Sequence, residues 1–472
     1  MPDAALRTLL PLTGWSAEQA ARVTFTGGSD PILPTPFRIG AAGAAALAAT
    51  GLAAADLWTW RTGRRQAIGV DVRQATASLR SGQYLQVGDG VVASERNPLM
   101  GFYPARDGRW SYIHANFPNH RAAAMQVLRC EESRDAVARA VATWDAADLE
   151  EAIIAANGAG GMVRSRTEWD RHPQAEAVAA LPVMEILRIG DSPPEPLPHG
   201  GLLGNRPLTG VRVIDMTRVL AGPTCARTLA EHGADVLKIS AAHLPNLGYQ
   251  DFDTGHGKLS ALLDLREPRN VDTLRALIRD ADVFSQGYRP GTLAARGLSP
   301  EDLAGLRPGL VYVSLSAFGH TGPWAARRGF DTVIQSVSGI AGRQAAAVPG
   351  RQPGPQFYPA SAIDYCTGYL MAAGAMIALR RRAEQGGSWL VRISLAQVGK
   401  WIVDLGEVPA PTLRDVPDEF TSGEREQWSI TTATPAGPLR HLKPVVQLSE
   451  TPPHWARPSV PAGYHPPVWP ER

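Results

Sequence analysis

The sequence predicts an α/β protein with a doubly wound parallel sheet and a second, smaller α+β domain. Two observations carry this prediction. From residue 207 onward, short runs rich in Val, Ile and Leu alternate with helical patterns, as in consecutive βαβ units. Earlier in the chain, two β-rich runs flank the turn residues Asp107–Gly108 and are followed by amphipathic helices, which is typical of an α+β domain.

The alternation can be followed element by element. A strand is predicted over 211–216, a helix over 224–232 and a second strand over 234–239, which together make one βαβ unit. The next predicted elements are, in order, a helix at 269–279, a strand at 282–286, a helix at 299–306 and a strand at 310–316. Ligands of such Rossmann-like sheets bind beyond the carboxyl ends of the strands, where this chain has loops containing Gly or Pro. Neither G-x-G-x-x-G nor the P-loop pattern occurs at a strand end, which disfavours NAD and P-loop nucleotide chemistry.

A shorter pattern occurs twice in the chain. An Ala-rich helix is predicted over 40–60, and a strand over 68–72 follows it. The same order recurs 321 residues later, where an apolar helix after Asp364 leads into a strand at 389–393. In this alignment Gly43 stands at the position of Asp364, so only the second copy supplies a carboxylate there.

Composition divides the chain into five segments. The Pro- and Gly-rich run at 192–206 cannot continue a helix or a sheet and is interpreted as a linker. It separates a lead segment (1–35) and the small α+β domain (36–191) from the Rossmann-like domain (207–400). The tail (401–472) is rich in Pro and lacks periodicity, so we expect largely irregular structure that lies along a neighbouring surface.

Composition also disfavours several classes of function. The formal net charge of +2 predicts no general attraction to nucleic acid or to a membrane surface. The three cysteines are too few and too far apart for a disulfide framework or a zinc site, so no metal is expected. The N-terminus shows no signal-peptide pattern, the Ala-rich stretch at 40–58 is interrupted by Thr50, Gly51 and Asp56, and the apolar run after Asp364 is interpreted as too short to span a bilayer. The prediction is a soluble, cytoplasmic protein.

Asp364 is the candidate catalytic residue. It stands at the start of a long apolar run, about 150 residues after the segment Pro207–Pro223. Taken alone, an Asp at this place is better explained as a helix N-cap, because its carboxylate accepts hydrogen bonds from the first helical turn. The alternative is a nucleophile, and the motifs in the rest of the chain favour it.

Several of these motifs occur in a fixed order. They are Pro207–Pro223, Gly233–Ile239, Gly257–Lys258 before Leu263–Leu265, Arg289–Gly291, Gly319–Pro323 and then Asp364. With them, residues 207–396 resemble the class III CoA-transferases, a family that includes formyl-CoA transferase, carnitine CoA-transferase and alpha-methylacyl-CoA racemase. The N-terminal part is similar to the portion that normally follows the nucleotide domain, so the chain resembles a divergent member with a fused and rearranged partial repeat.

The resemblance implies an acyl-CoA:carboxylate CoA-transferase that works through a covalent aspartyl intermediate on Asp364. Its substrates would be an acyl-CoA and a carboxylic acid acceptor, with no permanently bound cofactor. By motif position, the residues implied to contact coenzyme A are Leu220, Ala221, Lys258, Tyr288 and Arg328. The scarcity of lysine, with four residues against 43 arginines, adds weight to Lys258.

Two other functions remain open at this point. A racemase would need a second acid/base group, but Phe330 occupies the place where that branch has a histidine, and a phenyl ring cannot transfer a proton. A non-catalytic acyl-CoA-binding protein is the second alternative. Because family members form interlocked homodimers, the resemblance implies either a homodimer or, with both halves in one chain, an intramolecular pseudo-dimer.

Overall fold

A seven-stranded sheet forms the centre of the computed structural model, which describes residues 1–88, 90–91, 96–198, 205–245, 248–348 and 354–471. The strands lie in the order β11-β10-β9-β12-β13-β14-β8, and only the pair β14 and β8 is antiparallel. Their bounds are Met184–Gly190 (β8), Arg212–Met216 (β9), Asp235–Ser240 (β10), Lys258–Leu262 (β11), Val283–Gln286 (β12), Val311–Ser316 (β13) and Ser388–Ser394 (β14). The predicted doubly wound sheet is confirmed, and its topological switch point lies between β9 and β12.

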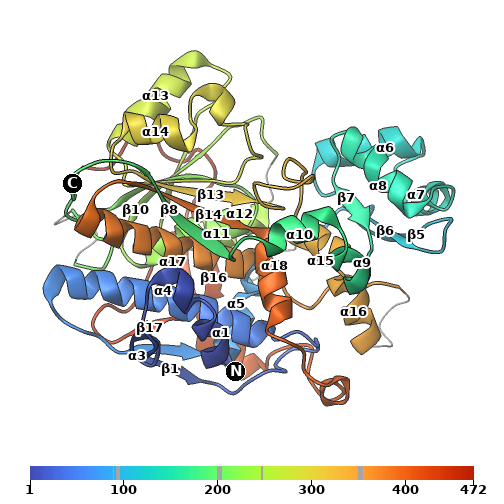
Figure 1. Cartoon of the computed structure of the whole chain (residues 1–472), viewed down its shortest axis with the longest axis horizontal. Helices are drawn as coiled ribbons and strands as arrows, with labels where there is room; N and C mark the ends of the chain where they lie inside the picture. Colours follow the sequence, from blue (N-terminus) through green and yellow to red (C-terminus); the bar gives the residue numbers. More distant parts are fainter. Residues whose placement is uncertain (89, 92–95, 199–204, 246–247, 349–353, 472) are drawn as a thin grey trace.

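Helices cover both faces of this sheet (Figure 1). They are α11 (Ala221–Glu231) and α17 (Ala362–Gln385) on one face, and α13 (Pro268–Arg279) and α14 (Pro300–Leu306) on the other. Successive strand residues serve the two cores in turn: Val213 belongs to the core shared with α11 and α17, and Ile214 to the core shared with α13 and α14. The apolar strand runs in the sequence follow from this double burial.

Helices α17 and α4 (Ile39–Thr62) pack against each other, with α17 next to the sheet and α4 outside it (Figure 1). Each has 24 residues and is long and apolar enough to cross a membrane by length and composition. The prediction that the run after Asp364 is too short was therefore wrong. In each helix, however, 94% of the apolar window is buried inside the protein, so packing in the core accounts for the composition.

The repeat is present in the structure with an offset of 323 residues, not 321. Helix α4 begins at Ile39 and α17 at Ala362, and each ends at a glycine, Gly63 and Gly386. We call β1 (Val23–Thr26), α4, β2 (Ile68–Asp71) and α5 (Val72–Ser78) the first copy, and β13, α17, β14 and α18 (Leu395–Asp404) the second copy. In both copies a parallel strand pair flanks the long helix in sequence, and the residue before the short helix caps it through its side chain.

The two copies exchange edge strands. Strand β8 follows the first copy in the chain but pairs antiparallel with β14 of the second copy. Strand β17 (Gln447–Leu448) follows the second copy but pairs antiparallel with β2 of the first. The first copy thus keeps only a three-stranded sheet, β1-β2-β17, and has no counterparts of β9 to β12 within it.

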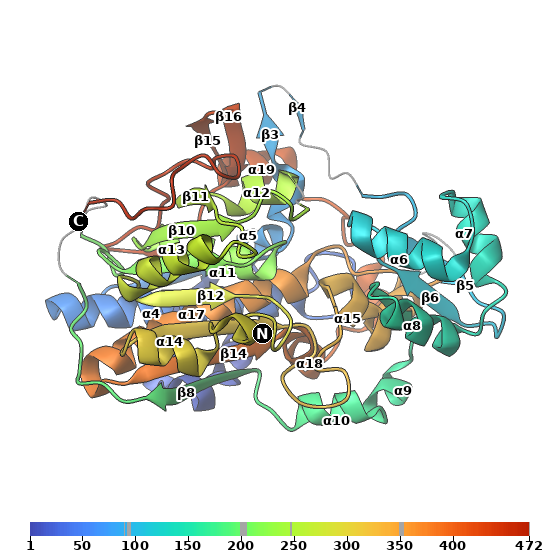
Figure 2. The same ribbon diagram turned by 90° about the horizontal axis from the view of Figure 1, so that it is seen from above.

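A small unit, residues 99–163, lies beyond the carboxyl ends of the parallel strands (Figures 1 and 2). It has its own core beneath the sheet of β5 (Gly101–Pro104), β6 (Trp110–Ile113) and β7 (Gly160–Met162). Its helices are α6 (Pro118–Leu128), α7 (Arg134–Val141) and α8 (Ala146–Ala155). The predicted hairpin around Asp107–Gly108 is present, with Gly108 at φ +74°.

The side chains do not pack along the predicted domain boundaries. Residues of the first copy share one core with the Rossmann-like domain, because α4 lies directly on α17, so 36–191 is not a separate packing unit. The tail also contains more regular structure than predicted. Helix α19 (Ser422–Trp428) leads into a hairpin of β15 (Ser429–Thr434) and β16 (Gly437–Leu442), which pairs with β3 (Gln86–Val87).

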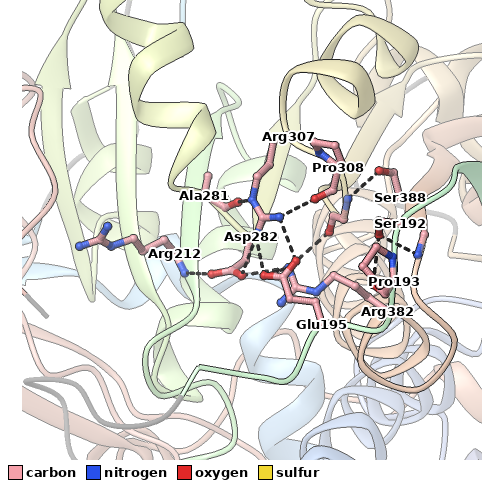
Figure 3. A network of polar contacts seen from close by, with 12 residues as sticks. Ser192, Pro193, Glu195, Arg212, Ala281, Asp282, Arg307, Pro308, Arg382 and Ser388 are labelled. Carbon is pink, nitrogen blue, oxygen red and sulfur yellow. Dashed lines mark hydrogen bonds and ion pairs between the residues drawn. The ribbon is translucent and has the colours of Figure 1, made fainter.

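The predicted linker is fixed to the base of the sheet over its described part (Figure 3). Glu195 accepts two hydrogen bonds from Arg307, at 2.9 and 2.6 Å. The Arg382 guanidinium, fully buried at the end of α17, lies 2.9 Å from the buried Asp282 carboxylate, which also accepts from the Arg212 N–H. These contacts join the linker, the sheet and α17. Residues 199–204 of the predicted linker lie outside the described residues.

Candidate active site

A cavity of about 400 Å³ lies at the switch point of the sheet. Its walls are the loops after β9, β12 and β13, the start of α17, and the part of the small unit around Phe117 and His120. Carboxyl ends of parallel strands meet at one edge of a sheet, and doubly wound proteins bind their ligands there. Five of the predicted site residues line this cavity: Leu220, Ala221, Tyr288, Arg328 and Asp364.

Asp364 lies in the first turn of α17, but the carboxylate that caps this helix is that of Asp331. The Asp364 N–H donates to Asp331 Oδ2 at 3.1 Å, and Gln335 Nε2 donates to Asp331 Oδ1 at 2.5 Å. The Ser361 side chain makes no capping bond. In the part of the chain that the structure describes, the Asp364 carboxylate itself has no hydrogen-bond partner, so it is available to a ligand in the cavity.

The two carboxyl groups perturb each other's ionisation. Burial raises the pKa of Asp331 to about 6, although the Gln335 amide and the backbone N–H groups of Ile363 and Asp364 favour its charged form. Burial first, and the Asp331 carboxylate second, raise the pKa of Asp364 well above its usual range. An ionised Asp364 is therefore a stronger base, and a better nucleophile, than an aspartate in water.

The equivalent place in the first copy has the cap but not the free carboxylate. Asp30 accepts from the N–H groups of Gly40 and Ala41, at 2.9 and 2.8 Å, just as Asp331 accepts at the start of α17. With the offset of 323, Ala41 occupies the position of Asp364, which corrects the predicted match with Gly43. Ala41 is buried at 2% exposure. Only the second copy therefore has a candidate nucleophile.

Four arginines line the same cavity as Asp364: Arg218, Arg289, Arg327 and Arg328. Arg327 pairs with Glu151 of the small unit at 2.6 Å. The Nε atom of Arg328 is buried without a hydrogen-bond partner in the described ranges, and burial lowers the pKa of this guanidinium. Unpaired cations beside a cavity are suited to phosphate or carboxylate groups. Among the described residues, no group of three or more His, Cys, Asp or Glu side chains is placed to hold a metal ion.

The loop between β9 and α11 is strained and exposes helix amides. Val219 has φ +72°, a conformation that is rare for a β-branched residue and that clusters at functional sites. Leu220 precedes α11 without a side-chain cap, so the N–H groups of the first turn have no such partner. Both residues line the cavity. The loop thus presents backbone donors at the positive end of a helix.

Comparison with known proteins agrees with this geometry. A family model described as CoA-transferase family III matches residues 15–193 and 208–431. The chain belongs to CoA-transferase family III. An acyl-CoA transferase of Gibberella moniliformis is 26% identical over 96% of this chain and 92% of its own length. An acetyl-coenzyme A transferase of Hypoxylon pulicicidum is 28% identical over 66% of this chain and 55% of its own length.

Other proteins are matched over shorter stretches. The succinyl-CoA:glutarate CoA-transferase of Homo sapiens is 32% identical over 38% of this chain and 43% of its own length. A crystal structure of a CAIB/BAIF family protein from Brucella suis is 31% identical over 41% of this chain and 55% of that chain, with a TM-score of 0.37. Apart from the Gibberella protein, this chain spans about half the length of the curated relatives named here.

Within this family III chain, the prediction that Lys258 contacts coenzyme A is not supported by the geometry. Lys258 is buried at 1% exposure, and its Nζ donates to Asp215 Oδ2 and to the Pro223 carbonyl, both at 2.8 Å. Asp215 is fully buried and also accepts from the Thr217 N–H. The role of Lys258 is therefore structural: it neutralises a buried carboxylate beneath the loop that carries Leu220.

Substitutions of Arg328 and Lys258 should show that the two cations have different roles, one in ligand binding and the other in stability. We expect Arg328→Ala to weaken binding of coenzyme A about 10- to 100-fold, because a hydrogen bond to a charged group contributes roughly 1.5–3 kcal/mol. Lys258→Met should instead lower the unfolding midpoint, since it leaves Asp215 buried without its counter-charge, and the folded protein should bind coenzyme A as before. Isothermal titration at two salt concentrations measures the affinity of each variant for coenzyme A, and an unfolding curve measures the midpoint of each variant. Equal losses of affinity in the two variants would contradict this division of roles.

The small unit supplies cavity residues that the sequence analysis missed. Phe117 and His120 lie on the cavity wall, and the ring of Phe330 stacks on His114 with centroids 3.9 Å apart. Burial, together with Arg328, Arg218 and Arg289, lowers the pKa of His120 to about 4, so its ring is uncharged near neutral pH. No local pattern marks these residues, because only the folding of the small unit over the second copy brings them to Asp364's cavity.

Proposed function

We propose that this chain is an acyl-CoA:carboxylate CoA-transferase with Asp364 as its nucleophile. The observation that carries the proposal is the free Asp364 carboxylate in the switch-point cavity, where Asp331 has taken over the capping of α17. A carboxylate that serves only to cap a helix would be bonded to that helix. Membership in family III supports the same reading.

The proposed reaction needs one carboxylate and no resident cofactor. Asp364 attacks the carbonyl carbon of the acyl-CoA thioester, and the C–S bond breaks to give a mixed anhydride and the thiolate of coenzyme A. The thiolate then attacks the aspartyl carbonyl, which releases the acyl group as a carboxylate and leaves an aspartyl-CoA thioester. An acceptor carboxylate attacks this thioester, and return of the thiolate to the acceptor acyl group regenerates Asp364.

Backbone donors are suited to stabilise the negative charge that develops in these steps. Each tetrahedral intermediate carries an oxyanion, and preorganised N–H groups contribute most where water is excluded. The first turn of α11, which follows the strained residue Val219, presents such donors on the cavity wall. The cations Arg218, Arg289 and Arg328 line the same cavity and are suited to the phosphates of coenzyme A.

The exchange of edge strands supports an intramolecular pseudo-dimer. Strands β8 and β17 each complete the sheet of the opposite copy, so one chain contains two interlocked halves. The small unit that follows the first copy covers the cavity of the second. We therefore expect a mass of 50.5 kDa in solution, measured by light scattering, with one site per chain. A homodimer would give twice that mass.

Trapping of the covalent intermediate tests the proposed function. The protein is incubated with a panel of acyl-CoAs and then with hydroxylamine, which converts an activated aspartyl group into a hydroxamate. Peptide mass spectrometry should find the hydroxamate on the peptide that contains Asp364. An unmodified peptide with every donor would favour a binding protein. Exchange of α-hydrogens of the acyl group with deuterated water, without transfer of coenzyme A, would favour a racemase in which His120 supplies the second acid/base group.

The rate should depend on pH through the carboxylate pair. Asp364 reacts when ionised, and its pKa is raised by burial and by Asp331, so kcat should rise with pH along a limb that lies above the ordinary aspartate range. Asp331→Asn removes the neighbouring charge and should move this limb to lower pH. The stability of the folded state should change with pH in the opposite direction to kcat. Because the carboxyl pair binds protons more tightly in the folded state than in the unfolded chain, it favours folding at acidic pH, and this contribution is lost as pH rises. A limb that does not move in Asp331→Asn would contradict the coupling.

A further inference from the structure

The first turn of α11 carries two backbone N–H groups that are free to bind a ligand. In the described ranges, the N–H groups of Ala221 and Gly222 donate to no other group, and Ala221 lines the same cavity as Asp364. The turn lies directly against α17, since a Cβ at Gly368 would come within 2.4 Å of the Ala221 carbonyl oxygen. Gly368 is one helical turn after Asp364, so this contact fixes the start of α11 to the face of α17 that carries the proposed nucleophile.

A buried polar network holds the same turn from below. Lys258 begins the edge strand β11, and its side chain reaches past β10 to the end of β9, where its Nζ donates to Asp215 and to the Pro223 carbonyl, both at 2.8 Å. Asp215 also accepts from the hydroxyl and the N–H of Thr217. The Thr217 side chain packs on Gly222, where a Cβ would lie 2.4 Å from that of Thr217. The turn is therefore held at two consecutive residues through one carboxylate.

The contact between Lys258 and the Pro223 carbonyl is not explained by charge balance. Two apolar side chains of similar volume would avoid the cost of taking the charges of Lys258 and Asp215 out of water. An apolar pair could not, however, donate to the carbonyl of Pro223. This carbonyl follows Val219, whose φ of +72° is unfavourable and persists only where the surrounding structure holds the backbone. The second hydrogen bond of the lysine provides such a hold.

We propose that Lys258 is a positioning residue of the transfer reaction, and that the N–H groups of Ala221 and Gly222 donate to the oxyanion formed when Asp364 attacks the thioester. The inference rests on the proposed function, since it assumes this attack, and it goes further in naming the donors and the residue that fixes them. As the Asp364 oxygen bonds to the carbonyl carbon, the π electrons of the carbonyl move to its oxygen. Donors that are already in place need not reorganise at that moment.

Removal of both buried charges separates positioning from stability. The double variant Lys258→Met, Asp215→Asn leaves no unpaired charge, so it should recover part of the stability that Lys258→Met loses, and it should bind coenzyme A as before. We nevertheless expect its kcat for transfer to stay about 10- to 100-fold below that of the wild type, because the Pro223 carbonyl has lost its donor. Gly222→Ala should lower kcat similarly with no change of charge, since its methyl group collides with Thr217. A double variant with the wild-type kcat would overturn the proposal.

Exchange of oxygen for sulfur in the donor tests the oxyanion contacts directly. In a dithio analogue of butyryl-CoA, with C=S in place of C=O, the charge develops on sulfur, which accepts hydrogen bonds weakly. The ratio of kcat/KM for butyryl-CoA to that for the analogue should fall at least about tenfold in the double variant. The matched control is Arg382→Met, which breaks a buried ion pair at the base of the sheet and should leave this ratio unchanged. No fall in the double variant, or an equal fall in the control, would overturn the assignment of the donors.

Hydrogen exchange tests the positioning without any reaction. Peptides that cover residues 216–224 should exchange their amide hydrogens faster in the double variant than in the wild type, whereas peptides from α13 should exchange equally in both. This result, together with no transfer by the wild-type protein, would reject the proposed function and the oxyanion contacts but sustain Lys258 as the residue that fixes the turn. Unchanged exchange over 216–224 would overturn the positioning role, even if the wild-type protein transfers coenzyme A.

Discussion

Asp364→Asn should lower kcat for transfer of coenzyme A by at least about 1,000-fold, equivalent to roughly 4 kcal/mol of transition-state stabilisation. The amide is isosteric with the carboxylate but cannot attack a thioester. It also removes the repulsion between the charges of Asp364 and Asp331, so the variant should be folded and at least as stable as the wild type at pH 8. Coupled assays of thioester formation on the acceptor measure the loss, and urea unfolding measures the stability.

The matched control for this variant is Asp56→Asn, which changes an acid on the equivalent helix of the first copy. Asp56 lies outside the active-site cavity, so transfer should be unaffected. The Asp364→Asn protein should still bind coenzyme A, because the arginines that line the cavity are intact. Retention of a tenth or more of the wild-type rate would show that another group is the nucleophile.

Arg382→Ala should destabilise the protein by about 3–5 kcal/mol, the range observed when one partner of a buried ion pair is removed. The Arg382 guanidinium is fully buried and lies 2.9 Å from Asp282 and 3.3 Å from the Gly309 carbonyl (Figure 3). Without it, the Asp282 carboxylate stays desolvated, and Arg307 is the nearby cation, 3.8 Å away, that forms an ion pair with it. The shift in the first urea transition measures the loss.

Two further variants show whether the loss comes from the unpaired charge. Arg166→Ala breaks an exposed pair with Asp170 and should change stability little, because solvent screens such pairs. The double variant Arg382→Met, Asp282→Asn removes both charges and should recover part of the loss caused by Arg382→Met alone. If the double variant is no more stable than the single one, the packing of the long side chain, and not charge, accounts for the effect.

Periodicity predicted the central sheet well, because each of its buried parallel strands is a local apolar run followed by a helix that starts nearby. It did not place β8 in that sheet, since Met184–Gly190 pairs with a strand some 200 residues later and is only half-buried on the sheet edge. The repeat was found with an error of two residues. Its register became visible in the helix bounds and in the caps, where Asp30 and Asp331 accept from the equivalent N–H groups of Ala41 and Asp364.

The candidate site was predicted from motifs in a fixed order and missed where packing decides. Asp364 was singled out by the motifs that precede it, because a carboxylate at the start of an apolar helix is, taken alone, better explained as an N-cap. Its catalytic role stays a prediction. Lys258 could not be interpreted correctly from its motif, since a buried lysine with an acidic partner and an exposed phosphate ligand look the same in sequence. Phe117 and His120 gave no signal, because their role depends on how the small unit folds over a distant segment.

The presence of both halves in one polypeptide has an evolutionary consequence. In a symmetric homodimer every substitution is present in both subunits. A substitution that alters a wall of one pocket therefore also alters the same residue in the other subunit. Here the position of the proposed nucleophile could become Ala41 in one half while the other half retained Asp364, and the small unit could adapt to a single cavity. The two halves are also made in strictly equal amounts, so neither can be left without the neighbour that completes its sheet.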